Sequence, residues 1–165
     1  MAEEVESVVE EPETDTTVEG MDVEDTPFDL DLPVIEIDAA RYVEFVAHAK
    51  EAGFDSFVDL CAVDYFRRTP RYEVVVILRS HVAQRQIRVR VSVDGKRPEL
   101  DSIVHVFPGA NFYEREAYDL FGIVFSGHPD LTRILLPDEW EGHPLRKDYA
   151  VGSVPVQFKG SHKAS

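Results

Sequence analysis

Hydrophobic and polar residues recur along the chain with two different periods, and these periods predict both strands and helices. The apolar residues of 34–37 predict a first strand. After Asp38, apolar residues recur at helical spacing, so we expect a helix that Asp38 caps and Gly53 ends.

Three further strands are expected over 57–66, 72–78 and 87–93, where β-branched residues are frequent. The links between them, at 67–71 and 81–84, are too short for helical crossovers. The strands should therefore form a hairpin-linked meander. This pattern predicts a two-layer α+β domain with a mainly antiparallel sheet and helices on one face.

The second half of the domain should contain two helices, a short one over 98–106 and a longer one over 111–121. Asn111 and Glu114 are spaced as a capping box at the start of the longer helix. Gly122 is placed to end that helix in a left-handed conformation.

Within the longer helix, Arg115 and Asp119 are one turn apart and should form an ion pair. From Ile123 onward repeated prolines predict irregular structure. The chain should thus divide into a leader over 1–32, a globular domain over 33–140 and an extended arm over 141–165.

The net charge of −15 is concentrated in the leader. Residues 1–32 contain 13 acidic residues and no Lys or Arg, which leaves 32 − 13 = 19 acids against 17 bases elsewhere. Such a segment is predicted to be disordered, and the alternative is a docking tail for a basic partner. The nearly neutral remainder gives no electrostatic reason to bind nucleic acid.

Cys61 is the only cysteine and falls in an expected core strand. A disulfide framework is excluded, and one thiol cannot supply the roughly four ligands of an iron–sulfur cluster. The N-terminus shows neither a signal peptide nor an apolar run that could cross a bilayer. We therefore expect a soluble, intracellular protein.

Charged residues gather among apolar ones between Ala110 and Tyr149, and such charges need partners when buried. They predict an active site or a polar network that fixes an interface. The residues concerned are Glu114, Arg115, Glu116, Asp119, His128, Asp130, Arg133, His143, Arg146, Lys147 and Asp148.

An enzyme would use Glu114, Glu116 or Asp119 as acid and base, with His128 or His143 as a proton shuttle. Glu114 and Glu116 point in different directions on a helix, however, and no nucleophile lies in a recognisable turn. A self-contained active site is the weaker alternative.

A metal site formed by His128, Asp130 and His143 is weaker still, because no two histidines are spaced to share an ion on one helix face. Gly122 and Gly127 are isolated, so no Gly-rich nucleotide loop is present. We expect neither catalytic residues nor a metal or cofactor site in this chain.

Three ordered motifs resemble a known family. ERE-x-x-D-L-F-G-I at 114–123, GHPDL at 127–131 and GHPLRKDY at 142–149 are similar to the C-type, thirty-kilodalton subunit family of respiratory NADH:quinone oxidoreductase (complex I). The resemblance covers 34–149. The chain departs from it at Phe112, at Thr132 and Arg133, and at Ala150, where the family usually has tryptophan, two basic residues and proline.

The resemblance implies a peripheral subunit on the cytoplasmic face of the cell membrane, or on the matrix side in an organelle, held there only through its complex. Its partners would be other complex I subunits, chiefly the D-type chain that forms the quinone pocket. NADH oxidation, flavin and iron–sulfur clusters would belong to partner subunits. Alternatives are an equivalent subunit of a membrane-bound hydrogenase or other quinone-reducing complex, or a stand-alone carboxylate enzyme.

The charged constellation would then consist of buried pairs that set the register of an interface. The suspected interface residues are Glu114, Arg115, Glu116, Asp119, His128, Asp130, Arg133, Arg146, Lys147, Asp148 and Tyr149. The arm should lie across a partner and be open to trypsin after Arg146, Lys147 or Lys159 in the free subunit. The alternative is that the arm folds back over its own domain.

Overall fold

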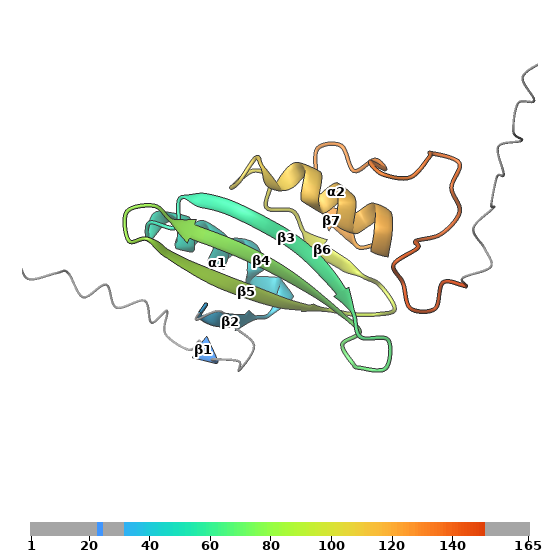
Figure 1. Cartoon of the computed structure of the whole chain (residues 1–165), viewed down its shortest axis with the longest axis horizontal. Coiled ribbons are helices and arrows are strands. Elements are labelled where there is room, and N and C mark those ends of the chain that lie inside the picture. The colour runs from blue at the N-terminus through green and yellow to red at the C-terminus, as the bar shows by residue number, and fades with distance from the viewer. Residues whose placement is uncertain (1–22, 25–31, 151–165) are drawn as a thin grey trace, which may run out of the picture.

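A five-stranded sheet forms one layer of the protein, with strand order β1-β2-β5-β4-β3 (Figure 1). The computed structural model describes residues 23–24 and 32–150. The strands of this sheet are β1 (Val23–Glu24), β2 (Val34–Ile37), β3 (Ser56–Asp64), β4 (Tyr72–Ser80) and β5 (Arg85–Val93).

The expected meander is confirmed, because β3, β4 and β5 pair antiparallel in sequence order. Strand β2 pairs parallel with β5, with Ile35 opposite Val89, so the sheet is mixed at this end. β1 adds a short antiparallel edge to β2. The α+β prediction with a mainly antiparallel sheet is therefore confirmed.

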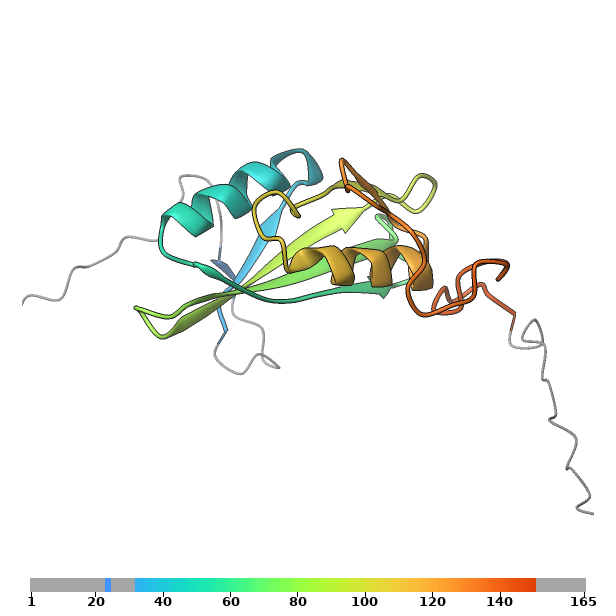
Figure 2. The same cartoon turned by 90° about the horizontal axis from the view of Figure 1, so that it is seen from above.

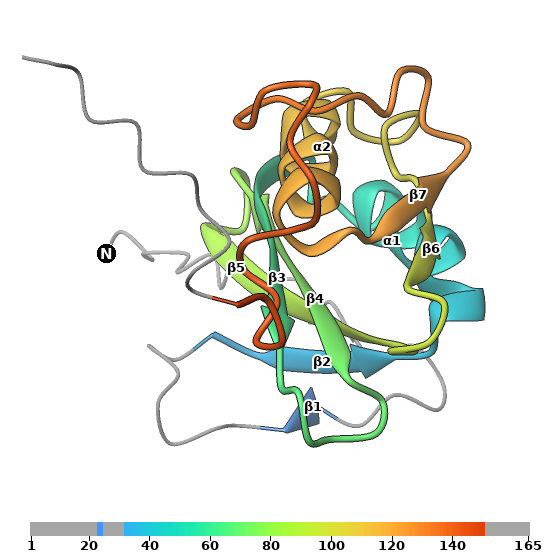
Figure 3. The same cartoon turned by 90° about the vertical axis from the view of Figure 1, so that its right-hand side faces the viewer.

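Two helices, α1 (Tyr42–Glu51) and α2 (Ala110–Phe121), lie on the same face of the sheet (Figures 2 and 3). A 3₁₀ turn, η1 (Ala39–Arg41), leads into α1. The expected cap at Asp38 is wrong, because its side chain makes no capping hydrogen bond and the chain enters the helix through the 3₁₀ turn.

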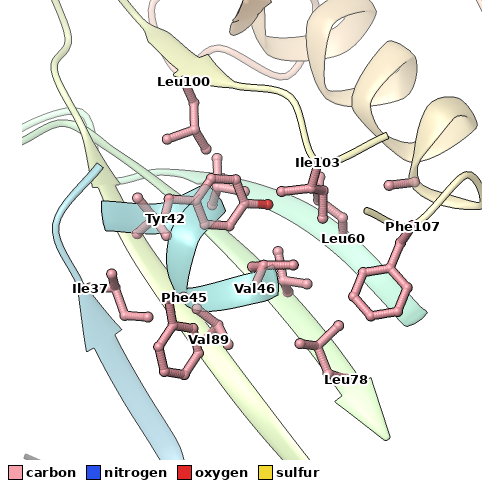
Figure 4. Packing of buried hydrophobic residues seen from close by; sticks show 14 of the residues in the cluster. Ile37, Tyr42, Phe45, Val46, Leu60, Leu78, Val89, Leu100, Ile103 and Phe107 are labelled. Carbon is pink, nitrogen blue, oxygen red and sulfur yellow. The ribbon is translucent and has the colours of Figure 1, made fainter. Parts of the chain in front are cut away.

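The core lies between this face of the sheet and the helices. Alternate residues of the central strands point into it, among them Val76 of β4 and Val89 of β5, both fully buried. Figure 4 shows Tyr42 of α1 among these residues, with its hydroxyl pointing toward Ile103. The helices cover the face that would otherwise expose a continuous apolar surface.

The helix expected over 98–106 is wrong. Glu99–Asp101 forms strand β6, which pairs parallel with β7 (Val124–Ser126), a strand in the part expected to be irregular. Leu100 is buried between exposed neighbours, which is the two-residue period of a strand. The connection between these parallel strands contains α2, so this helix is tied at both ends to one small sheet.

The placement of Cys61 in the core is also wrong. Cys61 lies in β3 as expected, but its side chain is exposed and belongs to the face of the sheet opposite the buried Leu60. In the residues that the structure describes, no helix is long and apolar enough to cross a membrane.

Candidate functional site

Glu114, on α2, is fully buried and holds the chain segment that follows β6. Its Oε2 accepts a hydrogen bond from Ser102 Oγ at 2.6 Å, and its Oε1 accepts one from the amide of Ile103 at 2.8 Å. Burial raises the pKa of Glu114 to about 7, although both hydrogen bonds oppose this shift. The Glu114 carboxyl group therefore holds residues 102 and 103 in place from inside the core.

This contact replaces the capping box expected between Asn111 and Glu114. Helix α2 begins at Ala110 after Gly109, and no side chain caps it. The amide of Asn111 bonds to the carbonyl of Pro108 instead. The predicted motif is wrong because the acid at this position is buried in the core and bonds to residues 102 and 103.

Asp119 organises the loop that follows β7. Its Oδ2 accepts hydrogen bonds from three consecutive amides, those of Ile134, Leu135 and Leu136, at 3.1, 2.8 and 2.9 Å. Its Oδ1 accepts one from Arg133 Nη1 at 2.6 Å. Burial alone would raise the pKa of Asp119, but these donors outweigh burial and hold the pKa below its usual value.

The ion pair expected between Arg115 and Asp119 is wrong. The Arg115 guanidinium instead donates to the carbonyl and hydroxyl of Thr132, at 3.1 and 3.0 Å, and to the carbonyl of Arg133 at 3.0 Å. Arg115 and Asp119 thus bind the carbonyl and amide sides of the same loop. Together they fasten residues 132–136 along the helix.

The C-terminal end of α2 is closed by residues of the third motif. Gly122 adopts the expected left-handed conformation, with φ of 71°. His143 Nδ1 contacts the carbonyl of Asp119 at 2.8 Å, and Arg146 Nε donates to the carbonyl of Phe121 at 2.5 Å. Because carbonyl oxygens only accept, Nδ1 of His143 carries a proton. These contacts satisfy helix carbonyls that have no partner within α2.

A second polar cluster fixes the segment around Asp148. Arg71 Nη2 lies 2.7 Å from Asp64 Oδ2 and 2.9 Å from Asp148 Oδ1. The amide of Lys147 donates to the buried Asp64 carboxylate at 2.8 Å. The hydrogen bond from Arg71, helped by that amide, lowers the pKa of Asp64 to about 2.

Asp64 and Arg71 lie outside the charged region between Ala110 and Tyr149, so the sequence did not single them out. One pattern in the sequence could have indicated this pair. An acidic residue ends an apolar strand, and after a turn an arginine comes directly before the next strand. Residues 141–150 of the expected arm thus contact their own domain. Residues 151–165 lie outside the described residues, and so does the leader apart from the backbone of β1 and residue 32.

The remaining suspected residues are more exposed. His128 Nδ1 accepts a hydrogen bond from the amide of Asp130 at 3.0 Å, and the hydroxyl of Tyr149 donates to a backbone carbonyl at 3.3 Å. Glu116 is exposed, and within residues 32–150 it forms neither a hydrogen bond nor an ion pair. Most of the suspected interface residues therefore bind groups of their own domain, and among them Glu114 and Asp119 are the two that are fully buried.

The buried carboxylates do not converge on one point. Glu114 faces the segment after β6, whereas Asp119 faces the loop over the opposite side of α2. Over residues 32–150, no three His, Cys, Asp or Glu side chains gather as a set of metal ligands. This geometry suits the fixing of backbone segments, which is the role of a structural polar network.

The fold and this network define an α+β domain whose motif residues bind its own backbone. The chain belongs to the family described as the respiratory-chain NADH dehydrogenase 30 Kd subunit, which matches residues 35–154. The expected family resemblance is confirmed.

Relatives named as the C-type subunit of NADH-quinone oxidoreductase include one from Roseiflexus sp. strain RS-1, 47% identical over 122 residues, which are 74% of this chain and 68% of that protein. Another, from Salinispora tropica, is 48% identical over 109 residues, which are 66% of this chain and 44% of that protein. The chain thus spans less than half the length of the Salinispora relative.

Two solved structures share the fold. One is described as "Nqo5 of the trypsin-resistant fragment (1-134) in P63 form", with a TM-score of 0.63, 37% identity, and coverage of 68% of this chain and 90% of that one. The other belongs to a membrane-bound sulfane sulfur reductase, an archaeal respiratory membrane complex. Its TM-score is 0.70 at 19% identity, and coverage is 88% and 90%. This second likeness shows the fold alone.

Proposed function

We propose that this chain is a non-catalytic structural subunit in the peripheral arm of a proton-translocating NADH:quinone oxidoreductase. It packs against the subunit that forms the quinone pocket and supports electron transfer from NADH to quinone. One observation supports this proposal most directly: the charged side chains of the motif point into their own domain. Its acids and arginines bind backbone groups of the same domain, so they shape a surface and do not act on a substrate.

The proposal assigns flavin and iron–sulfur clusters to partner subunits. One cysteine in 165 residues cannot supply the roughly four ligands of a cluster. The chain would reach the cytoplasmic face of the membrane, or the matrix side in an organelle, only through its complex. The relatives' names, which specify a subunit of an NADH-quinone oxidoreductase, support membership of such a complex.

An equivalent subunit of a membrane-bound hydrogenase or another quinone-reducing complex is the second candidate. The shared fold of the sulfane sulfur reductase chain favours it only at the level of architecture. Identity near 47% to NADH-quinone oxidoreductase subunits favours the first candidate. A stand-alone carboxylate enzyme is the weakest candidate, because Glu114 and Asp119 face different sides of α2.

Purification of the native complex through a tag on this chain tests the proposal. We expect the tagged chain to co-purify with an NADH-oxidising module and with the quinone-pocket subunit, and cross-links should join it to the latter. Flavin and iron should be stoichiometric in the complex and absent from the chain produced alone. Recovery of the chain as a free monomer, or of flavin or iron in that monomer, would contradict the proposal.

A further inference from the structure

We propose that the acidic leader of this chain, through residues 3–11, binds the loop at 65–71 that joins β3 to β4 (the β3–β4 loop). The contact lies within one chain and would cover the aromatic side chains that the loop exposes. The inference goes beyond the proposed function and does not depend on it, because it concerns the chain by itself.

The β3–β4 loop extends past the end of the sheet and exposes aromatic and basic side chains together (Figure 1). Phe66 is 47% exposed and Tyr65 is 37% exposed. The next two residues, Arg67 and Arg68, are exposed as well. Aromatic residues and arginine are the types enriched where one polypeptide binds another, so the loop is a candidate docking surface.

Contacts at the base of the loop hold it in a strained conformation. Phe66 has a φ of 49°, a left-handed value that is uncommon for a bulky residue. Its amide donates to Asp64 Oδ1 at 2.8 Å, and the amide of Tyr65 donates to the carbonyl of Arg71 at 2.9 Å. Backbone strain that neighbouring contacts maintain is common where a chain binds a ligand, and here it occurs at an exposed aromatic residue.

Each aromatic ring of the loop lies under a guanidinium group. The Arg68 guanidinium is 4.2 Å from the centroid of the Tyr65 ring, and the Arg71 guanidinium is 5.2 Å from the centroid of the Phe66 ring. A guanidinium stacked on a ring still has N–H donors at its edge that can bind a carboxylate. The loop therefore offers an apolar contact and a carboxylate donor within a few ångströms of each other.

The charge that the β3–β4 loop offers to a ligand is positive. Acids at its base already have arginine partners, in the pairs Asp64–Arg71, Asp148–Arg71 and Glu73–Arg90. Across the part of the chain that the structure describes, Arg67 and Arg68 form no ion pair. The turn at 94–97, whose Gly95 packs against Arg71, adds two exposed cations and one exposed acid.

Residues 3–11 of the leader complement the loop in both charge and polarity. Their sequence, EEVESVVEE, contains five acids and three valines. The carboxylates match the guanidinium donors, and the valines match the exposed rings. Residues 1–22 together contain nine acids and neither Lys nor Arg, so no base of the leader would compete for these carboxylates.

The leader is also long enough to reach the loop. It joins the sheet at β1, and by register Val23 is four strand spacings across the sheet and four residues along it from the end of β3, which is roughly 23 Å. A tether of the length of 12–22 spans at most about 36 Å and averages about 18 Å. Such a tether gives an effective concentration of about a millimolar, so even a weak contact would be occupied.

Charge and tethering argue against other occupants. A nucleic acid or an anionic membrane would approach a chain whose net charge is −15, and the two would repel each other. The leader of a second copy has the right chemistry but lacks the tether, so its effective concentration is lower. The observations therefore favour the leader of the same chain.

Paramagnetic NMR of the full chain tests the contact. A nitroxide is attached at Ser7→Cys in a chain that also has Cys61→Ser, so that only the leader carries the label. At low salt, the amide signals of 65–68 should fall at least about twofold relative to the reduced label, because the docked segment stays beside them. Unchanged signals at 65–68 would overturn the proposal.

The turn between β4 and β5 is the matched control position. By register, residues 82–84 are about as far from Val23 as the β3–β4 loop is, roughly 24 Å, but they contain neither an aromatic residue nor an arginine. Their signals should therefore keep their intensity. An equal loss at both places would show that the leader moves near the sheet without docking, and would overturn the proposal.

Charge reversal tests which residues make the contact. Arg67→Glu combined with Arg68→Glu should restore the signals of 65–68, since acids would then face acids. Arg41→Glu combined with Arg85→Glu changes the net charge equally at two other exposed arginines and should leave the loss unchanged. Equal restoration by both pairs would indicate a general charge effect and overturn the proposal.

Two further measurements keep the test decisive. Replacing the five glutamates of 3–11 by glutamine leaves the folded domain untouched and should also restore the signals, even if the loop variant fails to fold. In a mixture of labelled chain and isotope-enriched chain without the label, the signals of 65–68 should keep their intensity. A loss in the mixture equal to that within one chain would show docking between copies and overturn the proposal. None of these outcomes bears on membership of a complex, so the proposed function fails or stands separately.

Discussion

At the scale of single residues, the motif contains charges whose partners are far away in sequence. Helical spacing suggested that Arg115 would pair with Asp119, but Asp119 pairs with Arg133, fourteen residues later. Helical spacing gives no information about a loop that folds back on the helix and places three backbone amides within hydrogen-bond distance of one carboxylate. The sequence therefore located the polar cluster correctly but could not assign its pairs.

Glu114 gives a prediction about the pH dependence of stability. Its pKa is about 7 in the folded chain against an ordinary value of 4.5, so the folded state prefers the neutral carboxyl. Folding then takes up a proton between these values, and the free energy of unfolding falls as pH rises from 4.5 to 7. The loss is roughly 3 kcal/mol. Glu114→Gln should remove this component.

Urea unfolding of both proteins at several pH values between 4 and 8 measures this effect as the difference between their slopes. Tyr42, whose pKa is raised by burial and by Glu114, stays protonated throughout this window. Glu116→Gln, two residues further along the helix and exposed, serves as the control and should keep the wild-type slope. An unchanged slope in Glu114→Gln would show that Glu114 is ionised in the folded chain at these pH values.

At the scale of elements, the sequence predicted the elements that have a clear period. The meander of β3, β4 and β5 and the helices α1 and α2 follow from long alternating or helical patterns. Strands β6 and β7 have three residues each, and their pairing spans a helix. So short a pattern contains too little periodicity to distinguish a strand from a helix or a loop.

The end of α2 supplies a prediction with a matched control. Gly122 and Gly127 both have positive φ, at 71° and 81°, so alanine at either site strains the backbone by about 1 kcal/mol. At Gly122 a Cβ would also lie 2.5 Å from His143 Nε2 and collide with Arg146. At Gly127 no atom of the described residues lies within 4 Å of that position.

Gly122→Ala should therefore lower the free energy of unfolding by about 1–3 kcal/mol more than Gly127→Ala does, because it also displaces the side chains that close the helix. Equilibrium urea denaturation of the two variants measures the difference. Equal losses would indicate that His143 and Arg146 move aside freely and contribute little to holding the helix end.

At the scale of the whole molecule, the C-terminal segment shows where reasoning from sequence stops. Its prolines and glycines correctly excluded a helix or strand over 141–150. Its contacts were not predictable, because Asp64 and Lys147 are 83 residues apart and Arg71 and Asp148 are 77 apart. Polar contacts over such separations depend on the finished fold and leave no local pattern.

These contacts change the expectation for proteolysis. An unattached arm would be cut by trypsin after Arg146 and Lys147 in the free chain. In the structure, however, Arg146 donates to carbonyls at the end of α2, and the amide of Lys147 is bound by Asp64. Cleavage requires an extended, accessible backbone, so the free wild-type chain should resist trypsin at both sites.

Arg71→Ala should open these sites, because Arg71 joins the buried Asp64 to Asp148 in the C-terminal segment. The Arg71–Asp148 pair alone, with a half-exposed carboxylate, is worth only about 0–1 kcal/mol. Loss of the Asp64 contact adds more, since it leaves a buried carboxylate with amide donors only. Mass spectrometry of a trypsin time course should then show fragments ending at Arg146 or Lys147 several-fold sooner than in the wild type.

Arg68→Ala, an exposed change in the same loop, should follow the wild-type time course. Rapid cleavage of the wild-type chain at these two sites would instead show that residues 141–150 are free until a partner binds them.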